Sequence, residues 1–168
     1  MKKGLVIVLI SLLFLAGCEE NNVVEIDGEK VNTKEMIHEH CSRQGTLEGG
    51  EVSLNYDIYY TGEILNIVRS IEKVSSTDSS ILDDYEQAYK DIHAHYKNIK
   101  NYETEVIRTD DSVTSTILIN YDKIDIQALI DLEGEEDNVF ENKVPKVELW
   151  KSFAKKLGTT CTVIDEEL

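Results

Sequence analysis

Apolar and polar residues alternate most regularly between residues 52 and 60. A period of two places one set of side chains on the covered face of a β-strand and the other set on its opposite face. Thr61-Gly62 then indicates a turn, and residues 64–74 have the pattern of a partner strand. We therefore expect an antiparallel hairpin here. The residues of its covered face in the first strand are Val52, Leu54, Tyr56, Ile58 and Tyr60.

Helical spacing replaces this alternation after residue 80. Thr77 or Asp78 is suited to cap the helix that follows, because a short polar side chain can accept a hydrogen bond from the first free backbone N–H groups. We expect this helix to reach Tyr96. Its apolar positions are Ile81, Leu82, Tyr85, Ala88, Tyr89, Ile92 and Tyr96.

Two shorter helices are expected in the second half of the chain. Asp125 can cap one that ends near Gly134. Pro145 suits the first turn of the other, and Gly158 can close it. The apolar stripe of this last helix consists of Val147, Trp150, Ala154 and Leu157.

The remaining strands are expected at three places. Residues 102–109 and 112–120 predict a second hairpin, and residues 159–164 predict a last strand. Asp27-Gly28 marks a small hairpin within residues 24–31. Strand pairs separated by helices, without regular β-α-β alternation, predict an α+β domain. We expect a two-layer sandwich in which a mainly antiparallel sheet packs against helices.

The N-terminus has the pattern of a bacterial lipoprotein signal. Lys2 and Lys3 precede an apolar segment, residues 5–14, that is too short to cross a bilayer of about 30 Å. Leu15-Ala16-Gly17-Cys18 then resembles a lipobox, in which the cysteine sulfur accepts a lipid before cleavage. We expect lipidation of Cys18 and attachment to the cell membrane on its extracytoplasmic side. An ordinary secretory signal with a chance cysteine is the alternative.

This interpretation divides the chain into three parts. Residues 1–17 are expected to be the lipoprotein signal peptide, residues 18–36 a lipid-anchored polar tether with at most a small hairpin, and residues 37–168 the α+β domain. If Cys18 is lipidated, Cys41 and Cys161 remain. Two cysteines in an exported domain suggest a disulfide, with two buried thiols as the alternative. Because these cysteines bracket the predicted elements, we expect them on neighbouring strands.

The charge balance argues against nucleic acid as a partner. The chain has 33 acidic and 17 basic residues, which gives a formal net charge of −16. Binding to a phosphate backbone requires clustered lysine or arginine, and the sequence has no such cluster. The aromatic residues are eight tyrosines, three phenylalanines and one tryptophan, a composition that suits half-buried sheet positions and binding surfaces.

The segments CSRQGT, VSLNYDIYYTGE, LDDYEQAYKDIHAHYKNIKNYETEV, TSTILINYDKIDIQALIDLEG and VPKVELWKSFAKKLGTTC together resemble the YehR-like bacterial lipoproteins, a family of undescribed function. The resemblance extends from Cys41 to Cys161. It implies a small α+β lipoprotein domain with a sheet packed against helices. It assigns no catalytic or binding residues.

Two histidine pairs are the first candidates for a metal site. His93 and His95 are about 200° apart on a helix, so they cannot hold one ion together. His38 and His40 would share a face on a strand, but no cysteine or carboxylate accompanies them at a ligand spacing. We therefore expect no metal and no cofactor at these residues.

The acidic run Asp131–Asn138 offers oxygen ligands of the kind that calcium takes. Its glycine falls at the fourth position, whereas an EF-hand loop needs glycine at the sixth. A solvated loop is the better interpretation.

No phosphate-binding glycine loop, nucleophile elbow or zinc-protease motif occurs in the sequence. We therefore expect no catalytic residues, and a non-catalytic domain that binds an envelope protein or a small ligand. The alternatives are an envelope hydrolase or metal-dependent enzyme that uses the histidine pairs and the acidic run, and a structural spacer.

Overall fold

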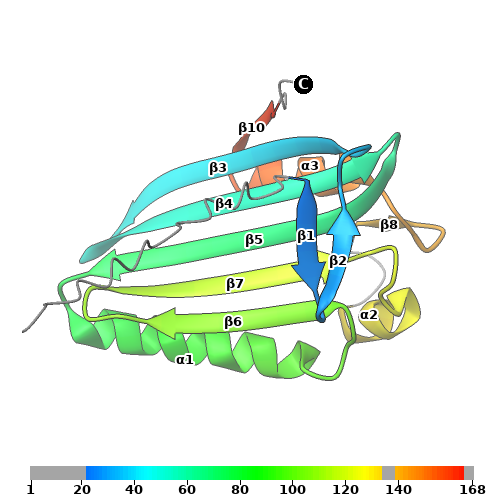
Figure 1. Cartoon of the computed structure of the whole chain (residues 1–168). Coiled ribbons are helices and arrows are strands. Elements are labelled where there is room, and N and C mark those ends of the chain that lie inside the picture. The colour runs from blue at the N-terminus through cyan, green and yellow to red at the C-terminus, as the bar shows by residue number, and fades with distance from the viewer. Residues whose placement is uncertain (1–21, 134–138, 165–168) are drawn as a thin grey trace, which may run out of the picture.

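The computed structural model describes residues 22–133 and 139–164. Its centre is a six-stranded antiparallel sheet with the strand order β10-β3-β4-β5-β7-β6 (Figure 1). The strands are β3 (Ile37–Leu47), β4 (Gly50–Thr61), β5 (Ile64–Ser76), β6 (Tyr102–Arg108), β7 (Ser112–Asn120) and β10 (Thr160–Val163).

Three helices and two small hairpins complete the described part of the chain. The helices are α1 (Ser79–Tyr96), α2 (Ile126–Glu133) and α3 (Val147–Lys156). The hairpins are β1 (Val23–Ile26) with β2 (Glu29–Asn32), and β8 (Phe140–Glu141) with β9 (Val144–Pro145). The α+β class and the mainly antiparallel sheet are confirmed.

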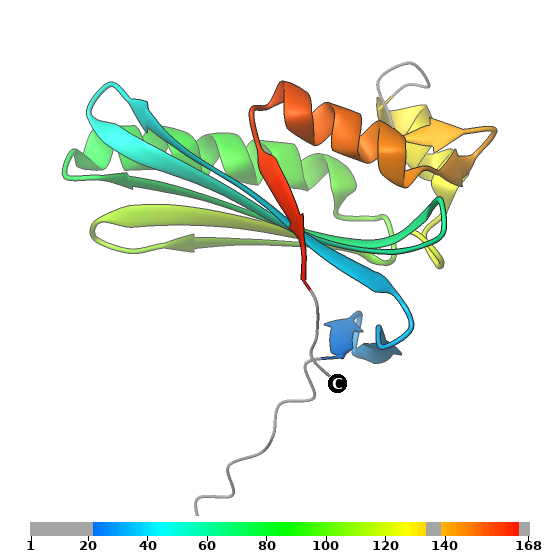
Figure 2. The ribbon, with the colours of Figure 1, turned by 90° about the horizontal axis from the view of Figure 1, so that it is seen from above.

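The helices and the first hairpin lie on opposite faces of the sheet. Figure 2 shows α1 and α3 on one face and the β1–β2 hairpin beyond the other. We call the first the helix face and the second the open face. Strand alternation sends Leu54, Tyr56 and Ile58 of β4 to the helix face, where they are buried.

The β1–β2 hairpin forms at Asp27-Gly28 as the sequence predicts, and both residues have positive φ angles. It contacts the domain, because the backbone N–H of Asn101 donates to the Asp27 carboxylate at 2.6 Å and Lys123 pairs with Glu29. Ile26 is only 1% exposed. This part of the segment that we expected to be a tether is therefore packed against the domain.

The core has two parts on the helix face. The larger contains Cys41, Tyr56 and Ile58 of the sheet with Trp150 and Ala154 of α3. The smaller joins α1 to the sheet through Val74, Leu82, Tyr89 and Val113. The helices α1 and α3 therefore cover different parts of one sheet face.

Most local predictions are confirmed. The β4–β5 and β6–β7 hairpins and the strand that carries Cys161 are present. Asp78 caps α1 by accepting from the backbone N–H of Ser80 at 2.9 Å. Asp125 accepts from the backbone N–H of Ala128 at 3.1 Å, ahead of α2. Gly158 follows α3 with a φ of 80°.

The expected place of Pro145 in the first turn of α3 is wrong. Pro145 lies in β9 and pairs with Phe140, and α3 begins at Val147. Asn142 and Lys143 both have positive φ angles, as the two central residues of a tight hairpin turn require. This turn holds Pro145 in an extended strand, and proline is tolerated there because the two-stranded sheet has open edges.

Of the helices in the described residues, none combines the length and the hydrophobicity that a membrane crossing requires.

Candidate functional site

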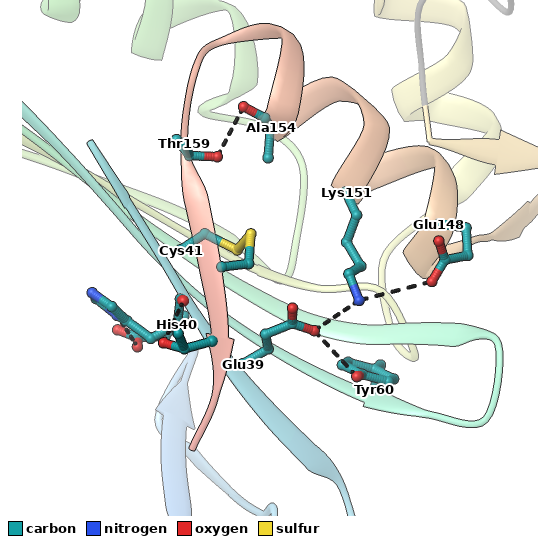
Figure 3. The surroundings of a disulfide bond; sticks show 11 residues. Glu39, His40, Cys41, Tyr60, Glu148, Lys151, Ala154 and Thr159 are labelled. Carbon is teal, nitrogen blue, oxygen red and sulfur yellow. Dashed lines mark hydrogen bonds and ion pairs between the residues drawn. A yellow bond between two sulfur atoms is a disulfide. The ribbon is translucent and has the colours of Figure 1, made fainter.

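The expected disulfide joins the start and the end of the domain. Cys41 of β3 and Cys161 of β10 are direct partners in the antiparallel register, and their Cα atoms are 3.9 Å apart. The bond ties the short edge strand β10 to the sheet, beneath the loop that follows α3 (Figure 3). Thr159, in that loop, donates its hydroxyl to the Ala154 carbonyl at 2.8 Å.

A buried charged cluster lies beside the disulfide. The Glu39 carboxylate accepts from the Tyr60 hydroxyl at 3.2 Å and pairs with Lys151 of α3 at 2.9 Å, as Figure 3 shows. Burial alone would lower the pKa of Lys151, but the hydrogen bond and charge of Glu39 outweigh it and raise that pKa. Burial, followed by the Glu39 charge, raises the pKa of Tyr60. The cluster therefore fastens α3 to β3.

Glu39, Cys41 and Cys161 also place one potential metal-ligand atom each within 4.8 Å of one another. The disulfide uses both thiols, and Lys151 neutralises the carboxylate. Thiolates are the form in which cysteine binds a metal. In this oxidised form the three residues therefore act as a structural link.

A groove of about 440 Å³ opens between the sheet and α3 on the helix face. Residues from the sheet, from α3 and from the loop before β8 line it. Most of these side chains are aromatic or aliphatic, and Phe153 at the groove is 47% exposed. The aromatic residues that line it are Tyr56, Tyr102, Tyr121, Phe140, Trp150 and Phe153.

Contacts among the aromatic rings hold the walls of the groove. Tyr56 and Trp150 meet edge to face, with ring centroids 5.2 Å apart and an interplanar angle of 82°. Tyr102 stacks on Tyr96 of α1 at 4.4 Å. Such contacts are favourable beyond simple area burial, and each aromatic side chain has few rotatable bonds. These contacts pack Tyr56 against Trp150 and Tyr102 against Tyr96 in the walls of the groove.

One carboxylate lies in this aromatic groove. Glu72 of β5 is among its lining residues. Burial raises the pKa of Tyr56, and the negative charge of Glu72 raises it further. Tyr89 behaves in the same way, with burial as the larger cause and Glu72 as the next. Both phenols are therefore neutral at physiological pH. Glu72 is the one charged side chain among the described lining residues, and the positive charge of Arg43, outside the lining, acts on Tyr56 in the opposite sense.

A second hollow, of about 530 Å³, lies between β1 and the open face. Its lining includes Glu25, Arg69, Glu103 and Glu105. Small-molecule sites are mostly apolar with a few placed polar groups, which describes the aromatic groove better than this charged hollow.

The two histidine pairs behave differently. His93 is buried in α1, and its Nε2 lies 2.9 Å from the Ser115 hydroxyl, whereas His95 is exposed with Nδ1 2.8 Å from the Asp91 carbonyl. As expected, these two do not converge. His38 and His40 share the open face, and both reach Asp57 of the neighbouring strand.

Other predicted residues fall outside the described part of the chain. Cys18 is one of them, together with the rest of residues 1–21. The acidic run Asp131–Asn138 is described only as far as Glu133, which ends α2. The solvated loop expected for this run therefore stays a prediction.

Sequence reasoning did not locate the groove, since its walls come from strands and a helix that are far apart in the chain. The surplus of tyrosines was the available signal, and three of the eight tyrosines line this groove.

Comparison with known proteins identifies the architecture. No protein-family model matches the chain, and no curated protein matches it. The NMR structure of the Escherichia coli YehR protein superposes with a TM-score of 0.53 at 20% sequence identity, covering 80% of this chain and 95% of that one. The chain has a YehR-like fold. An NMR structure of a protein from Streptococcus pneumoniae TIGR4 gives a TM-score of 0.45 at 15% identity, covering 96% of this chain and 98% of that one.

The resemblance seen in the sequence is thus confirmed at the level of the fold. At this identity a shared YehR-like fold carries no function with it.

Proposed function

We propose that the protein is a lipid-anchored, extracytoplasmic binding protein of the cell envelope that takes an amphipathic small molecule into the aromatic groove. In this proposal the sheet and the helices act as a two-layer sandwich, with the binding site between the layers. The observation that carries the proposal is the groove of about 440 Å³, lined by six aromatic residues and one carboxylate.

The proposed location, at the membrane on its extracytoplasmic side, rests on the N-terminal sequence. The basic start, the apolar segment of residues 5–14 and Leu15-Ala16-Gly17-Cys18 together form the pattern of a lipoprotein signal. Two or more acyl chains on Cys18 would hold the protein stably, at about 0.8 kcal/mol for each buried CH₂ group. The Cys41–Cys161 disulfide is consistent with an oxidising compartment.

The chemistry of the groove favours a cationic ligand with an aromatic or apolar body. Aromatic faces attract cations through their ring quadrupoles, and the Glu72 carboxylate adds a negative charge in the groove. The acidic balance of the whole chain increases the local concentration of cations near its surface. An anionic ligand would be repelled by all three features.

Binding accounts for this groove better than catalysis does. General acid-base chemistry at neutral pH needs groups with pKa values near 7. In the groove, burial and the Glu72 charge raise the pKa of Tyr56 away from that range. Among the described lining residues, Glu72 is the one carboxylate and no histidine or cysteine accompanies it.

Trp150 provides the test, because it is the only tryptophan of the chain and it lines the groove. We would titrate the protein with phenylbutylammonium, phenylbutanol and phenylbutyrate, which share a body and differ in head-group charge, and record the tryptophan fluorescence. We expect saturable binding in the order ammonium, alcohol, carboxylate. Equal responses to all three, or no saturable response, would contradict the proposal.

Two variants and a matched control sharpen the experiment. Glu72→Gln should remove most of the preference for the ammonium compound over the alcohol. Phe153→Ala should weaken all three ligands, because it removes an aromatic wall. Leu149→Ala alters a residue of the same helix that is 42% exposed and does not line the groove, and it should leave binding unchanged.

A further inference from the structure

His38 and His40 share one face of β3 because side chains alternate along a strand. On the open face, the register places Tyr59 of β4 opposite His38 and Asp57 opposite His40. Asp57 therefore lies beside both imidazoles. The sequence could not reveal this carboxylate, which lies on a different strand.

The three side chains converge on a single atom. Asp57 Oδ1 lies 3.1 Å from His38 Nε2 and 2.9 Å from His40 Nδ1. The His38 ring is stacked on Tyr59, with ring centroids 4.4 Å apart and an interplanar angle of 12°. The stacking limits the movement of that imidazole and keeps its Nε2 directed at the carboxylate.

We propose that His38, His40 and Asp57 form a binding site for a divalent transition-metal ion of the zinc type. Imidazole nitrogen and carboxylate oxygen are both zinc ligands, and three protein ligands with one open position describe a zinc site that can exchange its fourth ligand. Ligand atoms around a tetrahedral zinc ion are about 3.3 Å apart. The two nitrogen–oxygen separations seen here are close to that spacing. The two imidazole nitrogens are more than 4.8 Å apart, so they have to approach each other when an ion binds.

An ion has access to these residues and room for a fourth ligand. The side chains of His38, His40 and Asp57 are 18%, 35% and 26% exposed. A hollow of about 260 Å³ adjoins His38 and Tyr59, and water or a ligand atom fits there. Binding would replace the two hydrogen bonds to Asp57 with bonds to the metal. The His38 ring would stay stacked on Tyr59, and the more exposed His40 ring would turn so that its nitrogen faces the ion.

The other histidines serve as internal controls. His93 is buried and its Nε2 is hydrogen-bonded to Ser115, so this nitrogen is not accessible to a metal ion from solvent. His95 is exposed on α1 and has no histidine partner on its helix face. A zinc ion that bound unspecifically to any surface imidazole would use His95 as readily as His40.

The test is a calorimetric titration of the untagged full chain, purified in detergent and freed of metal with a chelator, with Zn²⁺. We expect one site with a Kd in the micromolar range or below. His40→Ala and Asp57→Asn should each weaken binding at least about tenfold. His95→Ala should leave the Kd unchanged. No heat of binding, or equal affinity in all four proteins, would overturn the proposal.

A measurement on the unaltered protein covers the case in which a variant fails to fold. Nitrogen NMR of the imidazole rings should show large zinc-induced shifts at His38 Nε2 and His40 Nδ1, with His93 and His95 unchanged. Shifts confined to His95 would show that zinc binds elsewhere. This site and the aromatic groove lie on opposite faces of the sheet. The zinc proposal and the ligand-binding proposal can therefore be refuted independently.

Discussion

Cys41 and Cys161 face each other across the antiparallel pair β3–β10, with a chain separation of 120 residues and a bond between their sulfurs. Closing so long a loop stabilises the folded state by up to about 5 kcal/mol in the chain-entropy model, because it restricts the unfolded chain. We therefore expect reductant to lower the melting temperature by roughly 5 to 15 °C. Thermal melts with and without reductant measure this.

The control for the disulfide is a Cys41→Ala/Cys161→Ala variant, which should melt at the lower temperature and should not respond to reductant. An unreduced, undenatured protein that yields two alkylatable thiols would contradict the cross-link.

Removing only one partner of the Glu39–Lys151 ion pair should destabilise the fold. Lys151→Met leaves the buried Glu39 carboxylate with the Tyr60 hydroxyl but without a positive partner. We expect the free energy of unfolding to fall by about 1 to 3 kcal/mol, less than for a fully buried pair because Lys151 is partly exposed. Urea denaturation measures the difference.

Two further variants test the physical reason. Adding Glu39→Gln to Lys151→Met removes the unpaired charge and should recover part of the lost stability. Lys155→Met changes an exposed lysine of the same helix and should cost less than about 0.5 kcal/mol. If Lys155→Met were as damaging as Lys151→Met, the effect would come from α3 in general and not from Glu39.

His93 should make the protein less stable in mild acid. Burial lowers the pKa of His93 below its ordinary value of 6.5, so the unfolded chain takes up a proton at a higher pH than the folded protein does. Stability therefore falls as the pH drops from 6.5 to the lowered pKa, and no further loss from this group occurs below it. Chemical denaturation at a series of pH values would record the slope.

His93→Gln, which can still bond Ser115, should flatten that slope, whereas the exposed control His95→Gln should retain it. An unchanged slope in His93→Gln would assign the acid sensitivity to other groups.

Cys18 should be the first residue of the mature protein and should carry lipid. The lipobox pattern predicts cleavage before this cysteine, so Cys18→Ser should accumulate as an unprocessed precursor. Mass spectrometry of the mature N-terminus decides the matter. A free, unmodified terminus at another residue would rule out the lipid anchor.

The sequence by itself determined the local elements of this protein. The alternation in residues 52–60, the turn at Asp27-Gly28 and the cap at Asp78 each depend on residues within a few positions of one another. Such short-range preferences act before any tertiary contact forms, so a pattern of neighbours is enough to predict them. Pro145 is the exception, since the Asn142-Lys143 turn held it in a strand.

Only the tertiary structure decided which side chains meet. Asp57 reaches His38 and His40 because β3 and β4 pair in one particular register, and a shift of one residue would turn Asp57 to the helix face. Lys151 meets Glu39, and Trp150 meets Tyr56, because α3 packs against the sheet at one position. Registers and packing positions result from the burial of the whole core, and no short segment of sequence contains that information.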